Sequence, residues 1–318
     1  MSRLNISNIR VEMAKVIVGQ EKIIDALIRG ILANGHILIE GVPGLAKTVI
    51  IRTLAHVLGC DFNRVQFTID LLPSDIIGIN SFDPKSGEYK IIKGPIFTNV
   101  LIADEINRAS PKVQAALLEG MAEKQVTIGK ETQHLPKPFF VFATQNPLES
   151  LGTYPLPQAQ LDRFLFKIVI HYPTPNEELT VIDQNLNTSD FNAFEVNKLF
   201  SPKEIDELQE LVKNIHISKD IKKYVVNIMD ATRNPKKYNL KLGEYIDIGC
   251  GPRATIAIVQ AAKAEAFMNE RDYVTPHDVK EVGYDVLRHR LNINYLGQAK
   301  GIQSDKIIQE ILLKVPLP

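Results

Sequence analysis

The segment from Glu40 to Val49, "EGVPGLAKTV", contains the residue types of a phosphate-binding loop. In such a loop, successive backbone N–H groups surround the phosphates, a lysine neutralises the outer ones, and a hydroxyl side chain ligates magnesium. Here these parts are supplied by Gly41, Gly44, Lys47 and Thr48. Ala46 stands where the pattern G-x-x-x-x-G-K-[ST] has its second glycine, so this match alone does not decide whether a nucleotide binds.

Two adjacent carboxylates, Asp104 and Glu105, follow a short apolar run in "VLIADE". Neighbours at a strand end can diverge toward different targets, so Asp104 could ligate magnesium while Glu105 acts on an attacking water. Acids commonly follow strands, and in isolation this pair would mean little. It gains weight because it comes after a strand, a glycine loop and a helix that begins with Lys47.

Three further residues could contact a γ-phosphate. Asn146 in "FFVFATQNP" could hydrogen-bond water and phosphate, or form a turn before a proline. Arg163 in "AQLDRF" could act as an arginine finger, and Arg253 in "CGPRA" begins a helix, although a surface ion pair would be favoured for either arginine in isolation. Arg108 in "EINRAS" could contact nucleotide across a subunit interface or pair with a surface acid, and we favour the first.

The pattern of elements indicates how these residues are positioned. Short β-rich runs at residues 37–40, 64–69, 99–105 and 138–146 alternate with helical spacing, as in residues 47–59. Runs that are apolar on both faces and alternate with helices predict a parallel sheet, and ligands of such sheets bind beyond the carboxyl ends of the strands. Two hairpin patterns interrupt the alternation, at residues 79–92 with a turn at Pro84 to Gly87, and at residues 124–135 with Gly129 at the tip. They are either surface loops without function or projections that contact something.

Four helix starts are visible as a hydroxyl residue before a proline. They are Ser110-Pro111, Thr174-Pro175, Ser201-Pro202 and Thr275-Pro276, and the last three have an acid at the third helical position. No convincing strand follows Pro173, so we expect a helical second domain that includes "IDELQELV" and "RATIAIVQAAKAEAF". A length of 318 residues agrees with two domains.

The composition excludes several classes of protein. The 37 basic and 37 acidic side chains cancel, so no global field attracts nucleic acid or an anionic membrane. Only Cys60 and Cys250 are present, which excludes a disulfide framework and a cysteine-built zinc site and suggests two buried apolar residues. No apolar run is long enough to cross a bilayer and no signal-peptide core is visible, so we expect a cytoplasmic protein.

Six segments taken together resemble the MoxR family of AAA+ ATPases over nearly the whole chain: "IVGQ", "GVPGLAKT", "LIADEINRASPKVQAALLEGMAE", "ATQNP", "GTYPLPQAQLDRF" and "GPRA". The resemblance implies an α/β fold, with a P-loop NTPase parallel-sheet αβα core at residues 1–175 that carries two β-hairpin inserts, and a C-terminal all-α lid domain at residues 176–318. It implies an ATPase that uses ATP and Mg²⁺, assembles as a homo-oligomer, most simply a hexameric ring, and remodels or matures a partner protein in a chaperone-like way, for example by insertion of a metal or cofactor. It also implies a partner that carries a von Willebrand factor A domain.

The resemblance also implies roles for particular residues. Val18, Gly19 and Gln20 would lie near the adenine, Thr48 and Asp104 would hold magnesium, and Asp104 and Glu105 would form the Walker B pair. Asn146 would be sensor 1, Arg163 the finger offered to a neighbouring subunit, and Arg253 sensor 2. The loop that holds the nucleotide would comprise Gly41, Val42, Pro43, Gly44, Leu45, Ala46, Lys47, Thr48 and Val49. Gln158 departs from the glutamate we expect in the family, which leaves the role of that carboxylate open.

Two other functions remain open at this point. One is a magnesium-chelatase-like ATPase subunit or a nucleic-acid motor of the same branch. Neutral charge and the lack of aromatic-basic clusters disfavour the nucleic-acid motor. The other is a scaffold that binds nucleotide without hydrolysis, which the Asp104-Glu105 pair disfavours. For Ala46, we expect a negative, helix-like φ, at which a methyl group costs little, so that Ala46→Gly leaves ATP binding nearly unchanged, while Gly41 and Gly44 carry the conformations that need glycine.

Overall fold

The computed structural model describes residues 5–84, 87–147, 152–187 and 194–318. The chain forms two compact units. Unit 1 comprises Met1–Leu27, His36–Leu156 and Ile168–Glu207, and unit 2 comprises Ile28–Gly35, Pro157–Lys167 and Leu208–Pro318. The predicted boundary between residues 175 and 176 stays a prediction.

A five-stranded sheet organises unit 1. Its strands, in the order β2-β5-β8-β1-β9, are β2 (Phe62–Gln66), β5 (Val100–Asp104), β8 (Phe140–Gln145), β1 (Ile37–Glu40) and β9 (Phe166–Val169). The pairs β2–β5, β5–β8 and β1–β8 are parallel, and β5 is buried at every residue. This confirms the predicted α/β fold with a parallel sheet, because strands covered on both faces must be apolar throughout.

Two details of the predicted sheet were wrong. The run at residues 64–69 forms a strand two residues earlier, at β2, although Phe67 still donates its N–H to the carbonyl of Asp104 at 2.8 Å. Beyond Phe67 the chain turns outward and Ile69 is exposed. The edge strand β9 was not predicted, since its sequence "FKIV" is short and carries a lysine.

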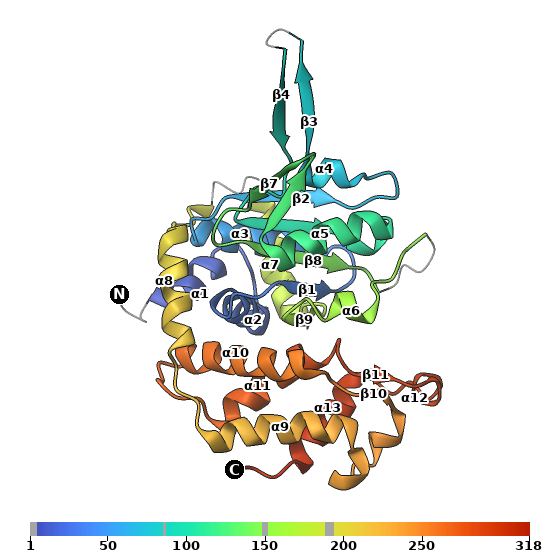
Figure 1. Ribbon diagram of the computed structural model, residues 1–318. Helices are drawn as coiled ribbons and strands as arrows, with labels where there is room; N and C mark the ends of the chain where they lie inside the picture. The colour runs from blue at the N-terminus through green and yellow to red at the C-terminus, as the bar shows by residue number, and fades with distance from the viewer. Residues whose placement is uncertain (1–4, 85–86, 148–151, 188–193) are drawn as a thin grey trace. The chain divides into compact units, whose positions relative to one another are not determined.

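Helices and hairpins complete unit 1. The helices are α1 (Asn5–Ala14), the first part of α2 (Glu21–Leu32), α3 (Lys47–Val57), α4 (Pro73–Ile77), the 3₁₀ turn η1 (Ile106–Arg108), α5 (Pro111–Glu123) and α7 (Pro175–Asn187). Both predicted hairpins are confirmed: β3 (Gly78–Asp83) pairs with β4 (Glu88–Lys93), and β6 (Gln125–Ile128) pairs with β7 (Glu131–His134). Figure 1 shows that the β3–β4 hairpin reaches away from the rest of unit 1. Residues 85 and 86 of its predicted turn lie outside the described residues.

Unit 2 is mainly helical. It contains α6 (Gln158–Leu161), the second half of α8 (Pro202–Lys213), α9 (Lys219–Arg233), η3 (Pro235–Tyr238), η4 (Leu242–Tyr245), α10 (Pro252–Met268), α11 (Pro276–Leu287), α12 (Tyr295–Ala299) and α13 (Ser304–Lys314). The expectation of a region without strands was wrong in one detail, because β10 (Ile246–Ile248) and β11 (Asn292–Ile293) pair antiparallel. Strands of three and two residues are too short to show a period in the sequence.

Three of the four predicted helix caps have the expected hydrogen bonds. Glu177, Glu204 and Asp278 each accept from the backbone N–H and the hydroxyl of the residue before the proline, at 2.7 to 2.8 Å. Ser110 makes no side-chain cap bond, although α5 does begin at Pro111. The difference follows from the missing acid at the third position of α5, since the acid makes the shorter contacts in the other three.

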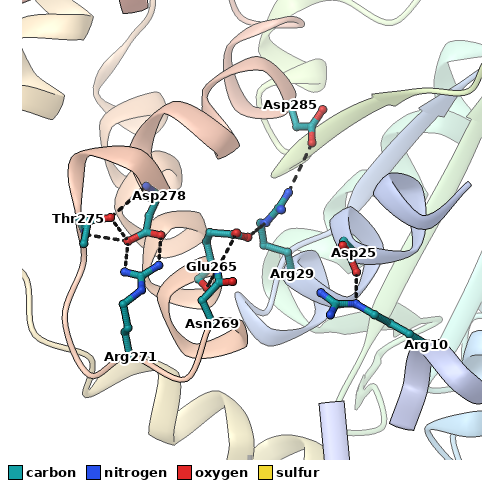
Figure 2. A network of polar contacts seen from close by, with 9 residues as sticks. All are labelled: Arg10, Asp25, Arg29, Glu265, Asn269, Arg271, Thr275, Asp278 and Asp285. Carbon is teal, nitrogen blue, oxygen red and sulfur yellow. Dashed lines mark hydrogen bonds and ion pairs between the residues drawn. The ribbon is translucent and has the colours of Figure 1, made fainter. Parts of the chain in front are cut away.

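A buried polar network joins the helices of unit 2 (Figure 2). Arg29, at the end of α2, lies 2.6 Å from a carboxylate oxygen of Glu265 on α10 and 3.8 Å from one of Asp285 on α11. The other oxygen of Glu265 accepts from Asn269 at 2.8 Å. Because burial of an unpaired charge is costly, each of these charged groups is paired within unit 2.

In the described part of the chain, no helix is long and apolar enough to cross a membrane.

Candidate functional site

The predicted phosphate loop connects β1 to α3 in unit 1. The strand ends at Glu40, whose carbonyl accepts from the N–H of Ile170 at 2.8 Å, and the helix begins at Lys47. Gly44 has a φ of 86° and open space where a side chain would begin, so it needs glycine as predicted. Gly41 does not have a positive φ, which corrects the expectation. It is restricted instead by proximity, since an added Cβ would lie 3.2 Å from Ile170.

Ala46 has a left-handed backbone conformation, with φ 53° and ψ 23°. The expected negative φ was therefore wrong. The residue precedes the first helical turn and does not yet share its dihedral angles, so its methyl group meets the steric cost that a glycine avoids.

Lys47 is held within the loop. Its Nζ donates to the carbonyl oxygen of Gly41 at 2.6 Å, across the turn of the loop. The ammonium group therefore lies on the concave side of the backbone, where a lysine neutralises bound phosphate in loops of this kind.

Asp104 ends β5 and has a defined partner on each carboxylate oxygen. Thr144 on β8 donates its hydroxyl to Oδ1 at 2.6 Å. On Oδ2, Arg64 of β2 donates from Nε at 2.9 Å and from Nη2 at 2.6 Å, and the hydroxyl of Thr48 lies at 3.5 Å. The structure thus brings the hydroxyl of Thr48, after the loop, close to the carboxylate of Asp104, at the end of β5. A shared magnesium site would need this proximity.

Glu105 leaves the strand in a left-handed conformation with φ 56°. Its Oε2 accepts from the side-chain amide of Gln66 at 2.7 Å and forms an ion pair with Nε of Arg108 at 3.0 Å. For Arg108, the structure thus shows a pairing with an acid, the less favoured of the two alternatives. That acid is the predicted catalytic carboxylate, so Arg108 belongs to the site.

The residues expected near adenine form a tight turn. Gly19 and Gln20 have φ values of 67° and 58°, and the Glu177 side chain lies against Gly19, where an added Cβ would be only 2.0 Å from Oε1. Within the described residues, Oε1 of Gln20 is buried and has no hydrogen-bond partner. An orphaned acceptor of this kind fits an amino group of a ligand. Val18 is half-buried beside them.

Asn146 is buried at 5% exposure directly after β8, which lies between β5 and β1 in the sheet. At the carboxyl edge of the sheet, Asn146 therefore lies between the end of β5, which carries Asp104, and the end of β1, which enters the phosphate loop.

The two predicted arginines both belong to unit 2. Asp162, beside Arg163, is 3.6 Å from Nη1 of Arg253, the second residue of α10. The same carboxylate accepts from Nε of the buried Arg290 at 2.7 Å. Burial lowers the pKa of Arg290, and the contact with Asp162 opposes that shift. Gln158, the departure from the family pattern, donates to the carbonyl of His289 at 2.8 Å, so an amide serves a structural role there.

Four residues that contact the predicted site residues were not predicted from the sequence. They are Arg64, Gln66, Thr144 and Arg290. A signal existed for the first two, because alternate residues of a predicted strand share a face. The sequence alone does not show that Arg64 and Gln66 contact Asp104 and Glu105, because this depends on β2 being the neighbour of β5 in the sheet.

The donor set fits a nucleotide with a divalent cation. A hydroxyl and a carboxylate oxygen are hard ligands of the kind that Mg²⁺ prefers, and Lys47 supplies charge for phosphate beside them. Among the described residues there is no cluster of three or more histidine, cysteine or acidic side chains that could hold a metal ion.

Comparisons with known proteins agree with this fold and site. Residues 36–166 match the model of the ATPase family associated with various cellular activities (AAA), and residues 242–311 match the AAA lid domain. Chaperone MoxR1 of Mycobacterium tuberculosis is 44% identical over 96% of this chain and 81% of its own length. Protein MoxR of Methylorubrum extorquens is 30% identical over 96% of this chain and 93% of its own.

A solved structure is also similar. The crystal structure of a proposed ATPase from Cytophaga hutchinsonii is 47% identical, with a TM-score of 0.93, and the match covers 99% of this chain and 96% of that one. Sequence relatives and the fold point to the same family. The chain belongs to the MoxR family of AAA+ ATPases.

Proposed function

We propose that the protein hydrolyses ATP with Mg²⁺ and couples hydrolysis to the remodelling or maturation of a partner protein. The observation that carries the proposal is the approach of Thr48 to Oδ2 of Asp104, at 3.5 Å, beside a loop whose lysine faces inward. This is the arrangement that phosphoryl transfer requires, since the protein mainly has to position the reactants and neutralise charge.

Each residue has a distinct task in this proposal. Lys47 neutralises the outer phosphates, and Thr48 and Asp104 hold Mg²⁺, which would withdraw charge from the phosphate oxygens. Glu105 orients the attacking water and accepts its proton. Among the described residues, the contacts of Glu105 with Gln66 and Arg108 both go to Oε2, so we propose Oε1 as the oxygen that accepts from the water. Asn146 hydrogen-bonds the water or the γ-phosphate.

Arg163 and Arg253 are proposed to respond to the nucleotide from unit 2. Asp162 accepts from the buried Arg290, lies 3.6 Å from Nη1 of the exposed Arg253 and is next to Arg163 in sequence, so we propose it as the residue that connects the two arginines. Arg163 would act on the nucleotide of a neighbouring subunit, which makes the active site a property of a ring, most simply a hexamer. The cytoplasmic location also remains a prediction.

The β3–β4 hairpin is proposed as the part that contacts the partner. Four of its apolar side chains are exposed, namely Ile79, Phe82, Tyr89 and Ile92, and the rings of Phe82 and Tyr89 lie 5.3 Å apart. Exposed apolar groups on a projecting ribbon are unfavourable in water unless something covers them part of the time. The relatives named chaperones and MoxR proteins support a protein substrate, and a von Willebrand factor A domain stays the predicted partner type.

Hydrolysis is tested with Lys47→Ala and Glu105→Gln. Lys47→Ala should abolish ATP binding, whereas Glu105→Gln should keep binding and lose turnover, measured by phosphate release and by fluorescence of a labelled ATP. Glu119→Gln, on the exposed face of α5, makes the same chemical change and should behave as wild type. Wild-type protein that binds ATP without turnover at any protein concentration would replace this proposal with a non-hydrolysing scaffold.

The action of Arg163 in trans has its own test. Arg163→Ala should bind ATP without turnover, and mixing it with Lys47→Ala should restore part of the activity through mixed interfaces. Co-assembly without any recovery would show that Arg163 acts within its own subunit.

The hairpin is tested by capture of partners on Glu105→Gln protein held with ATP. Phe82→Ser with Tyr89→Ser should lose the captured protein and keep basal turnover. Capture that survives both changes would assign the contact to another surface.

A further inference from the structure

Thr144 is buried on β8 and contacts both members of the predicted Walker B pair. Its hydroxyl oxygen lies 2.6 Å from Oδ1 of Asp104 and 2.9 Å from the backbone nitrogen of Glu105. Its neighbour on the other side is Ile39 of β1, the strand that enters the phosphate loop. The side chain is fully buried, so no water competes for these two contacts.

The direction of both hydrogen bonds follows from the partners. A hydroxyl has one hydrogen to donate, a carboxylate can only accept, and a backbone N–H can only donate. The hydrogen of Thr144 therefore goes to Asp104, and its oxygen accepts from Glu105. A length of 2.6 Å is that of a hydroxyl bound to a charged carboxylate, the stronger class of hydrogen bond.

These contacts decide where each carboxylate points. With Oδ1 engaged by Thr144, it is Oδ2 of Asp104 that faces Thr48 and the predicted metal position. Glu105 turns out of the strand with φ 56°, a conformation that is sterically unfavourable for a residue with a side chain. The bond from its N–H to Thr144 holds the backbone at that turn and so sets the direction of the side chain.

We propose that Thr144 is the positioning residue of the site, in which one hydroxyl orients Asp104 toward the metal and Glu105 toward the water. This inference rests on the proposed ATP hydrolysis. It assigns a role to a residue between the two groups that phosphoryl transfer uses, and Thr144 itself touches neither metal nor nucleotide.

Threonine suits this role better than serine would. A β-branched side chain is stiff at χ1 and favoured in strands, so its hydroxyl is held in one direction before any ligand binds. Serine at this position would keep the hydroxyl with more rotational freedom, and valine would keep the shape without the hydroxyl.

The test compares Thr144→Val with Thr144→Ser. Thr98→Val is a matched control in unit 1, because Thr98 is also buried and its hydroxyl has no hydrogen-bond partner among the described residues. Three quantities are measured: the affinity for Mn²⁺ in the presence of ADP, by electron paramagnetic resonance of the free ion, the affinity for ADP in EDTA, and kcat against KM for ATP.

Thr144→Val is expected to weaken Mn²⁺ binding and to lower kcat by about 10- to 100-fold each, the range found when groups that orient metal ligands are removed. Its affinity for ADP in EDTA should stay within about twofold of wild type, which also shows that the variant is folded, because the phosphate loop is unchanged. Thr144→Ser should keep most of the Mn²⁺ affinity and most of kcat, and Thr98→Val should match wild type in both.

Three results would overturn the inference. The first is that Thr144→Val has the same Mn²⁺ affinity and kcat as Thr98→Val. The second is that Thr144→Ser and Thr144→Val lose Mn²⁺ affinity and kcat equally. The third is that the affinity of Thr144→Val for ADP in EDTA falls as much as its affinity for Mn²⁺. If Thr144→Val does not fold, Thr144→Ser decides, because a purely packing role would lower its metal-free ADP binding together with its Mn²⁺ binding. Wild-type protein that binds Mn²⁺ and ADP without turnover would refute the proposed hydrolysis, while the Mn²⁺ affinities would still test Thr144.

Discussion

Protonation of His36 is expected to destabilise unit 1 as the pH falls below about 6.5. His36 is buried just before β1. Its Nδ1 accepts from the N–H of Val141 at 3.0 Å, so the ring hydrogen is on Nε2, which lies 3.1 Å from the carbonyl of Met121. Burial, with a smaller contribution from the charge of Lys124, lowers the pKa of His36 to about 4. A proton on Nδ1 would face the N–H of Val141 and break that hydrogen bond.

The sign and size of the effect follow from the two pKa values. The unfolded chain binds a proton near pH 6.5 and the folded one only near pH 4, so the unfolded state holds more protons between these values and acid favours it. The stability contributed by neutral His36 is present above pH 6.5 and is lost as the pH falls to 4. The full shift corresponds to about 3 kcal/mol, of which about 2 kcal/mol is lost between pH 7 and pH 5.

Urea denaturation at pH 7 and pH 5 measures this effect. The free energy of unfolding of wild type should fall by about 2 kcal/mol more between these pH values than that of His36→Asn, which keeps an acceptor for Val141 and does not titrate. The loss of packing in the variant is the same at both pH values, so it cancels when the changes in the free energy of unfolding between pH 7 and pH 5 are compared. The contribution of buried His289 is present in both proteins and cancels as well. His134→Asn, at an exposed histidine of β7, measures what an exposed imidazole contributes. Equal falls in wild type and His36→Asn would refute the assignment.

Three other outcomes are expected. Ala46→Gly should raise the free energy of unfolding by about 0.5 to 1 kcal/mol in urea denaturation, because relief of the left-handed conformation exceeds the added entropy of the unfolded chain, and a lower value would contradict the strain. Arg64→Met should increase Mn²⁺ affinity severalfold in the presence of ADP, since Arg64 binds the oxygen of Asp104 that faces the metal position, and unchanged affinity would show that the arginine does not compete. Cys60 and Cys250, whose pKa values burial raises to about 12 and about 11, should react with a thiol reagent only on unfolding, and rapid labelling of native protein would contradict their burial.

The sheet and the ends of its strands could be predicted because they depend on local sequence. Buried strands such as β5 are apolar at every position until the last, and polar residues begin where the strand leaves the sheet. Asp104 and Asn146 therefore stand out as strand-end residues in the sequence itself. The hairpins are visible for the same reason, through alternation and turn residues such as Gly129.

The contacts around the site could not be predicted because they depend on which strands are neighbours. Arg64 and Gln66 meet Asp104 and Glu105 only because β2 pairs with β5, and Thr144 meets them only because β8 lies on the other side of β5. Strands β2 and β5 are far apart in sequence, with the β3–β4 hairpin between them. The order β2-β5-β8-β1 therefore supplies partners that no local pattern contains.

Backbone conformation is the other property that cannot be predicted from the residue types, and three of the left-handed residues with a side chain lie at the candidate site. Gln20, Ala46 and Glu105 are all residues with side chains and all have positive φ, between 53° and 58°. The three lie at the predicted adenine turn, in the phosphate loop and in the Walker B pair. Left-handed residues with a Cβ persist only where surrounding contacts outweigh their cost, and such contacts exist here for Glu105 through Thr144, Gln66 and Arg108. An alanine in place of the second loop glycine is thus one of several sites at which this chain accepts strain to hold a functional group in place. That is why the deviation from the glycine pattern could not be interpreted from the loop sequence alone.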